Sequence, residues 1–293
     1  MDIDGVFSGG GIKGLALIGA YQAIEEKGYT FKRLAGTSAG AVIAAFIAAG
    51  YSSRELLDIM DDVDFHKLLD SNAIIPLPIL KWFRIYYRLG LYKGVALENW
   101  LEEKLKARGI YTFADLPPHS LRVIASDLSN GRLLVLPDDL DKYGVAKETF
   151  PVARAIRMSA SLPYFFEPVK LRSLEGVSYM VDGGVLSNFP MWLFDRENVK
   201  KIRPVIGVKL SHDFIGKPKK QIKNAIDLYG ALFTTMKDAH DSRYISRKLE
   251  KNIIFIPTEG VLTTEFELTP ERKLELIQYG KSKAESFLQK WPY

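Results

Sequence analysis

The sequence contains no cysteine and only four histidines. The protein therefore forms no disulfide, uses no thiolate nucleophile and holds no metal through sulfur ligands. This composition is typical of a cytoplasmic protein. We expect that location also because no signal-peptide pattern precedes the apolar, strand-like run at residues 3–7.

One stretch, residues 34–53, carries no charged side chain and is long enough to cross a membrane. Its first part is rich in Gly, Ser and Thr and is typical of a turn. Only Ala39–Ala49 has the pattern of a continuous helix of small residues. We therefore expect a buried helix here rather than a membrane span.

The formal net charge is +5, and the charged residues are spread along the chain. A solvated surface explains this balance, and a weak attraction to anionic membranes is the sharper alternative. The sequence has no nucleic-acid-binding motif, so we expect no nucleic-acid partner.

Strands and helices alternate at the start of the chain. A strand at 3–7 and a helix at 15–27 are followed by a strand at 31–35, a turn and the small-residue helix. This order predicts an α/β fold with a mainly parallel sheet covered by helices. Further strands are expected at 121–125, 132–136, 177–181, 204–210 and 253–256, and further helices at 54–69, 97–108 and 270–288.

No internal repeat and no sharp change of composition divides the chain. We expect residues 1–293 to form one domain. Its motif-bearing core would span about 3–210, and residues 211–293 would complete it.

The loop at residues 9–14, Gly-Gly-Gly-Ile-Lys-Gly, lies between the first strand and the first helix. Its glycines fit the dinucleotide-binding pattern, but no acidic residue follows the second strand as that interpretation requires. The phosphate-binding P-loop is also excluded, because Leu15 and Ala16 stand where Lys and Ser or Thr are needed. Consecutive glycines at a helix start can still direct backbone N–H groups at an anion.

The next turn, residues 36–40, reads Gly-Thr-Ser-Ala-Gly and again lies between a strand and a helix. A serine at the centre of such a turn is held in a sharp bend with its hydroxyl exposed. This pattern predicts that Ser38 is a nucleophile, and the glycine loop could supply its oxyanion hole. A helix-capping turn without chemistry is the simpler alternative.

A serine nucleophile needs a base, and none of the four histidines is well placed in the sequence. His212 is the best of them by position, while His66, His119 and His240 fit surface or structural roles. Asp182 is a better candidate, because it ends an apolar strand and is followed by two glycines that permit close approach.

Together, these three segments resemble the patatin-like phospholipases. That family has a Gly-Gly-Gly-x-Arg/Lys-Gly block, a Gly-x-Ser-x-Gly block and an Asp-Gly-Gly/Ala block, in the order seen here. The segment from Ala153, ARAIRMSASLPYFFEPV, resembles a fourth family block. Lys13 stands where arginine is common, which keeps the charge but loses the bidentate fork.

The resemblance implies a three-layer α/β/α sandwich and hydrolysis of lipid acyl esters without a metal or cofactor. It implies a Ser38–Asp182 dyad and an oxyanion hole from Gly9, Gly10 and Gly11, with the amides of Gly10 and Gly11 at its centre and Lys13 supporting the charge. The expected substrate is a phospholipid or another lipid ester.

Residues 73–92 are rich in aromatic side chains interspersed with Lys and Arg. This mixture suits peripheral contact with a membrane surface, although an ordinary amphipathic helix is an alternative. Two other functions stay open: a non-hydrolytic module that binds an acyl group or nucleotide, and an acyltransferase or thioesterase on the same scaffold.

Overall fold

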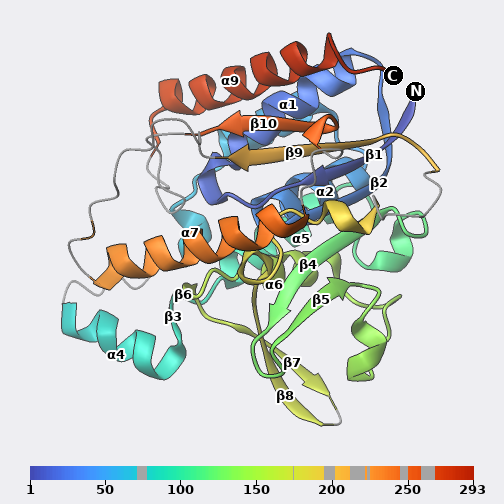
Figure 1. Cartoon of the computed structure of the whole chain (residues 1–293). Coiled ribbons are helices and arrows are strands. Elements are labelled where there is room, and N and C mark those ends of the chain that lie inside the picture. The colour runs from blue at the N-terminus through green and yellow to red at the C-terminus, as the bar shows by residue number, and fades with distance from the viewer. Residues whose placement is uncertain are drawn as a thin grey trace.

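A computed structural model describes residues 1–70, 78–173, 175–194, 202–211, 222, 225–244, 250–258 and 268–293. Its main element is a mixed sheet with mostly parallel strands, flanked by helices (Figure 1). The α/β fold expected from the alternating elements is confirmed. The strands of the described chain include β1 (Asp2–Phe7), β2 (Thr30–Thr37), β4 (Leu121–Asp127), β5 (Arg132–Leu136), β7 (Val169–Ser173), β8 (Gly176–Asp182), β9 (Val205–Ser211) and β10 (Ile253–Pro257).

The strand order in the sheet is β10-β9-β1-β2-β4-β8-β7, with β5 paired to β4. The pairs from β10 to β4 are parallel, whereas β8 runs antiparallel to β4 and to β7. A separate pair of short strands, β3 (Gly90–Tyr92) and β6 (Tyr164–Phe166), lies beside the sheet.

The sheet buries apolar side chains on both faces, because successive side chains of a strand point in opposite directions. In β1, Ile3 and Phe7 face one core cluster, and Val6 faces a second, smaller one. The larger cluster lies under helices α1, α2 and α9, and the smaller one is covered by residues 189–194. The helices of the described chain include α1 (Leu15–Glu26), α2 (Ala39–Ala48), α3 (Ser53–Asp62), α4 (Pro78–Arg88), α5 (Val95–Lys106), α6 (Val152–Ser159), α7 (Ala225–Tyr244) and α9 (Pro270–Leu288).

Helices α1 and α9 cross in close contact at two glycines (Figure 1). A Cβ on Gly19 would lie 1.9 Å from the Ile277 carbonyl oxygen, and one on Gly280 would lie 1.9 Å from the Ala16 carbonyl oxygen. Any larger residue would force the helices apart, so both positions require glycine for this packing.

The charge-free stretch forms β2 and then α2, whose side chains are mostly buried. No helix among the described residues is both long enough and apolar enough to span a membrane. The prediction of a buried helix is thus confirmed.

The single helix expected over residues 54–69 is wrong. Helix α3 ends at Asp62, and a short 3-10 turn follows at Lys67–Leu69. Between them the Asp64 carboxylate accepts a hydrogen bond from the His66 N–H, and such a local bond competes with the helix. The break turns Phe65 and Leu68 toward a cavity.

Of the aromatic segment 73–92, residues 73–77 lie outside the described residues. The rest forms α4 and β3. The salt bridge between Arg84 and Glu167, 3.6 Å long, ties α4 to the residue that follows β6.

Candidate active site

Ser38 lies at the sharp turn between β2 and α2, with φ 55° and ψ −125°. This conformation is strained for a residue with a side chain. The flanking glycines make it possible: a Cβ on Gly36 would lie 2.3 Å from the Gly40 carbonyl oxygen, and one on Gly40 would lie 2.3 Å from that of Phe7. The turn therefore has the geometry that the sequence pattern predicts for an exposed nucleophilic hydroxyl.

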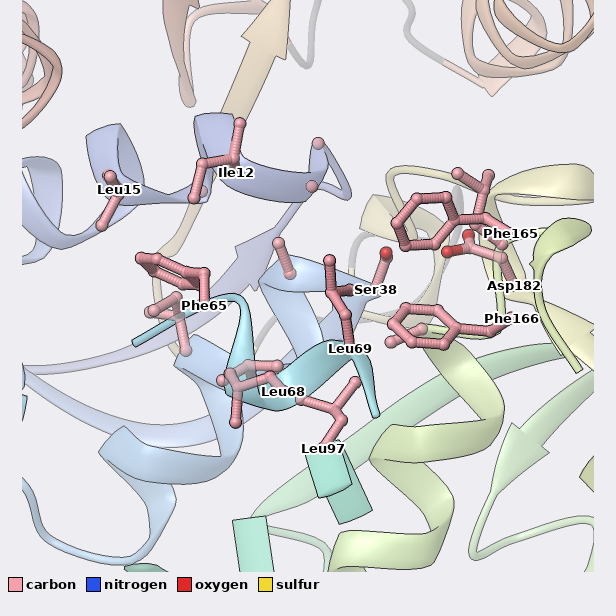
Figure 2. Close-up of a pocket in the computed structure, with 18 of the residues that line it drawn as sticks. Ile12, Leu15, Ser38, Phe65, Leu68, Leu69, Leu97, Phe165, Phe166 and Asp182 are labelled. Atoms are coloured by element: carbon pink, nitrogen blue, oxygen red, sulfur yellow. The ribbon is translucent and has the colours of Figure 1, made fainter. Parts of the chain in front are cut away.

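Strand register brings Asp182 close to this turn. Asp182 pairs with Ala125 on β4, and the neighbouring Ile124 pairs with Thr37 on β2. Asp182 ends its strand as the sequence predicts, but β8 runs antiparallel to β4, so Asp182 and Ser38 do not meet at the carboxyl edge of parallel strands. Figure 2 shows Ser38 and Asp182 at one end of the cavity.

The Asp182 carboxylate is buried and accepts a hydrogen bond of 2.7 Å from the Gly184 N–H, and the Ser38 hydroxyl lies beside it (Figure 2). Burial raises the pKa of Asp182 to about 6, although the Ser38 hydroxyl, the Gly184 N–H and the positive charge of Lys237 act in the opposite direction. A carboxylate with this pKa is largely ionised at pH 7 and is a better proton acceptor than an exposed aspartate.

The glycine loop borders the same cavity. Gly10 and Gly11 line it at the start of a 3-10 turn, Gly11–Gly14, that runs directly into α1. The N–H groups at a helix start have no partner within the helix. The N–H of Gly9 differs, because it donates to the Asn188 carbonyl over 3.1 Å.

The Lys13 ammonium donates to the Thr258 carbonyl, 3.1 Å away, at the end of β10. Lys13 is buried and does not appear among the residues that line the cavity. This contact ties the glycine loop to the C-terminal part of the sheet.

The cavity extends from Ser38 and has a volume of about 150 Å³. Apart from Ser38, Asp182, Asn188 and Lys237, its lining is apolar or glycine. The apolar side chains labelled in Figure 2 come from widely separated segments and include Ile12, Leu15, Phe65, Leu68, Leu69, Leu97, Phe165 and Phe166. Such a cavity fits a hydrocarbon chain next to a reacting group.

Three residues near the dyad were not found from the sequence. Phe233 and Lys237 line the cavity from α7, and Asn188 lines it from the segment after β8. The Asn188 side-chain amide donates a hydrogen bond to Asp241 Oδ2 over 3.5 Å. Asp241 also forms a largely buried ion pair with Lys209. Only Asn188 had a signal in the sequence, as a polar residue shortly after the Asp-Gly-Gly block.

The histidines are elsewhere. His66, His119 and His240 are described, and none of them lines the cavity. His212, the best triad candidate in the sequence, lies outside the described residues. Within the described residues, no cluster of three or more potential metal ligands occurs.

Known proteins are similar to this chain in sequence or in fold. The chain is 58% identical to the uncharacterized protein YqhO of Bacillus subtilis over 294 residues, which covers 100% of both chains. A match to the triacylglycerol lipase ptl3 of Schizosaccharomyces pombe has 26% identity and covers 64% of this chain and 38% of the lipase.

Among solved structures, VipD from Legionella pneumophila has the same fold, with a TM-score of 0.59 and 18% sequence identity over 99% of this chain and 67% of VipD. The model of the patatin-like phospholipase family matches residues 5–195, which include the glycine loop, the Ser38 turn and Asp182. The chain therefore belongs to the patatin-like phospholipase family.

Proposed function

We propose that this protein is a lipid acyl hydrolase of the phospholipase A or lysophospholipase type, acting through a Ser38–Asp182 dyad. The observation that carries the proposal is the position of the Ser38 hydroxyl beside the buried Asp182 carboxylate, at one end of an apolar cavity. Membership of the family and the match to a lipase support it.

In the first step, Asp182 takes the hydroxyl proton while Ser38 Oγ forms a bond to the ester carbonyl carbon. The tetrahedral intermediate then collapses, and the leaving alcohol takes the proton from Asp182. In the second step, water attacks the acyl-serine and gives a proton to Asp182. The second tetrahedral intermediate then collapses: the bond between Ser38 Oγ and the acyl carbon breaks, Ser38 takes the proton back from Asp182, and the fatty acid is released.

The negative oxygen of each tetrahedral intermediate needs hydrogen-bond donors. We assign this role to the N–H groups of Gly10 and Gly11, which border the cavity at the start of the helix. The Gly9 N–H is engaged by Asn188, and the Lys13 ammonium by Thr258. These two residues would thus support the hole by holding the loop in place.

The substrate class follows from the cavity lining. An acyl chain would lie along the apolar wall, which excludes water from the reacting ester. The polar part of the lipid would remain at the mouth. An acyltransferase or thioesterase would share the acyl-serine and differ in the acceptor or the leaving group, whereas a binding module would have no need of the strained Ser38.

We further propose that α4 contacts the lipid surface, as the aromatic composition of residues 73–92 predicts. Phe83, Tyr86 and Tyr87 are 60–77% exposed and form an aromatic cluster. The exposed Arg88 on the same helix would meet anionic headgroups. The helix is joined to the cavity wall through β3 and β6, so a membrane bound there would lie near the entrance.

The test of the reaction is fatty-acid release from phosphatidylcholine vesicles and from lysophosphatidylcholine micelles. We expect release by the wild type and none by Ser38→Ala. Ser126→Ala is the matched control, because it removes a buried hydroxyl without a hydrogen-bonding partner among the described residues. Equal release by Ser38→Ala would overturn the dyad, and products formed only with an added alcohol would indicate acyl transfer.

The lipid-surface contact is tested separately by sedimentation with anionic vesicles. The double variant Tyr86→Ser/Tyr87→Ser should bind vesicles more weakly than the wild type while hydrolysing a soluble short-chain ester at the same rate. Unchanged binding would remove α4 from the interface.

A further inference from the structure

Helix α6 ends next to the dyad and is followed by a buried serine. Ser159 and Ser161 are both 0% exposed. Ser159 Oγ accepts a hydrogen bond from the Ser38 N–H over 2.8 Å, and the Ser161 carbonyl accepts one from the Asp182 N–H, also over 2.8 Å. One short segment thus contacts the backbone of both dyad residues.

The hydrogen bond from the Ser38 N–H is accepted by a side chain and not by a backbone carbonyl. On its carbonyl side, Ser38 is held by α2, since its oxygen accepts from the N–H groups of Ala41 and Val42 over 2.9 and 3.2 Å. On its amide side, the bond that holds it is the one to Ser159. A strained backbone persists only where its surroundings fix it, so Ser159 holds one half of the turn.

We infer that Ser159 is a positioning residue for the nucleophile. Its hydroxyl fixes the peptide plane between Thr37 and Ser38, and that plane sets the direction of the Ser38 side chain toward Asp182. The inference rests on the proposed function, since it describes how the same dyad is kept in its reactive geometry.

A comparison with Ser126 distinguishes the positioning of Ser38 from a general contribution of a buried hydroxyl to the core. Both serines are completely buried, but the Ser126 hydroxyl has no hydrogen-bonding partner among the described residues. Replacing either by alanine removes the same atom from the core. Only Ser159→Ala leaves the Ser38 N–H without its acceptor.

The experiment measures the rate of covalent labelling by a fluorophosphonate, together with kcat and KM for a soluble p-nitrophenyl ester. For Ser159→Ala we expect labelling and kcat to fall about 10- to 100-fold with KM within about two-fold, because small errors of alignment slow the chemical step. Ser126→Ala should match the wild type, and Ser159→Cys, which keeps a weak acceptor, should lie between alanine and wild type.

The outcomes distinguish failure of the proposed function from failure of the positioning role of Ser159. If the wild type is not labelled, or Ser38→Ala is labelled equally, the proposed function fails. If the wild type is labelled through Ser38 but Ser159→Ala keeps its rate, or loses activity only through KM, the positioning role is wrong. Should Ser159→Ala fail to fold, Ser159→Cys decides, and wild-type kinetics in that variant would overturn the inference.

Discussion

The two ends of the cavity are held by different forces. At the end near Ser38 and Asp182, the two residues lie at the ends of β2 and β8, the strands on either side of β4, and are fixed by hydrogen bonds to buried partners. At the other end, Phe65, Leu68 and Leu97 come from short segments and helices and are held by apolar packing. At the first end, activity should be sensitive to the loss of a single polar atom. At the second end, it should be sensitive to changes of side-chain volume.

The largest effect is expected at the polar end. Asp182→Asn keeps the shape of the side chain but removes the proton acceptor, so kcat should fall about 10³-fold. Circular dichroism and thermal unfolding check that the variant is folded. Near wild-type turnover in a folded variant would contradict the dyad.

At the apolar end, Leu68→Phe should shorten the space for the acyl chain. We expect kcat/KM for a long-chain ester to fall about 10-fold relative to a short-chain ester, the equivalent of about two methylene groups that can no longer be buried. Leu68→Met is the control, since it nearly conserves the volume. Equal losses on both substrates would place the bound chain elsewhere.

A smaller effect is expected from the charge near the base. The Lys237 cation favours the ionised form of Asp182, whose pKa is about 6. Activity should therefore rise with pH through about 6, and Lys237→Met should move that rise to higher pH, with a loss of a few-fold at pH 6. Lys290→Met, on an exposed lysine that does not line the cavity, is the matched control. An unchanged pH profile, or a shift to lower pH, would contradict a stabilising effect of the Lys237 charge on ionised Asp182.

The last effect is on the free energy of unfolding rather than on the rate, and it depends on pH. The pKa of Asp182 lies above its ordinary value of 3.8, so protonation favours the folded state, and this stabilisation is lost as pH rises through about 6. Asp182→Asn carries no charge at any pH. Relative to the wild type, its free energy of unfolding should therefore be higher at pH 8 than at pH 4.5, by roughly 1–3 kcal/mol. Urea unfolding at the two pH values measures the difference, and a gap that is the same at both would argue against a buried charge.

The polar end could be predicted from the sequence because each part is encoded locally. The Ser38 turn and the glycine loop each combine a strand, glycines and a helix within a few residues. Asp182 could be selected on the same kind of local signal, an apolar strand followed by two glycines. The antiparallel direction of β8 could not be predicted, because local sequence does not specify which strand becomes the partner.

The rest depends on contacts between distant segments. Ser159 and Lys237 become part of the site only through tertiary packing. Ser159 lies in the segment that resembles a fourth family block, but that pattern does not indicate which residue it contacts, and Lys237 stands in no distinctive local pattern. The break after α3 was missed because Val63, Phe65 and Leu68 continue an apolar pattern that also fits a helix. The contacts of Phe65 and Leu68 in the cavity wall, together with the local hydrogen bond to the Asp64 carboxylate, outweigh that helical tendency.

The crossing of α1 and α9 has a consequence for how the protein can be shortened. The family model ends at residue 195, yet α9 packs on the helix that begins at the glycine loop, and Thr258 binds Lys13 within that loop. A chain cut after residue 195 would lose both supports, and Lys237 with them. Such a shortened chain would still contain Ser38 and Asp182, but the glycine loop would be held less firmly.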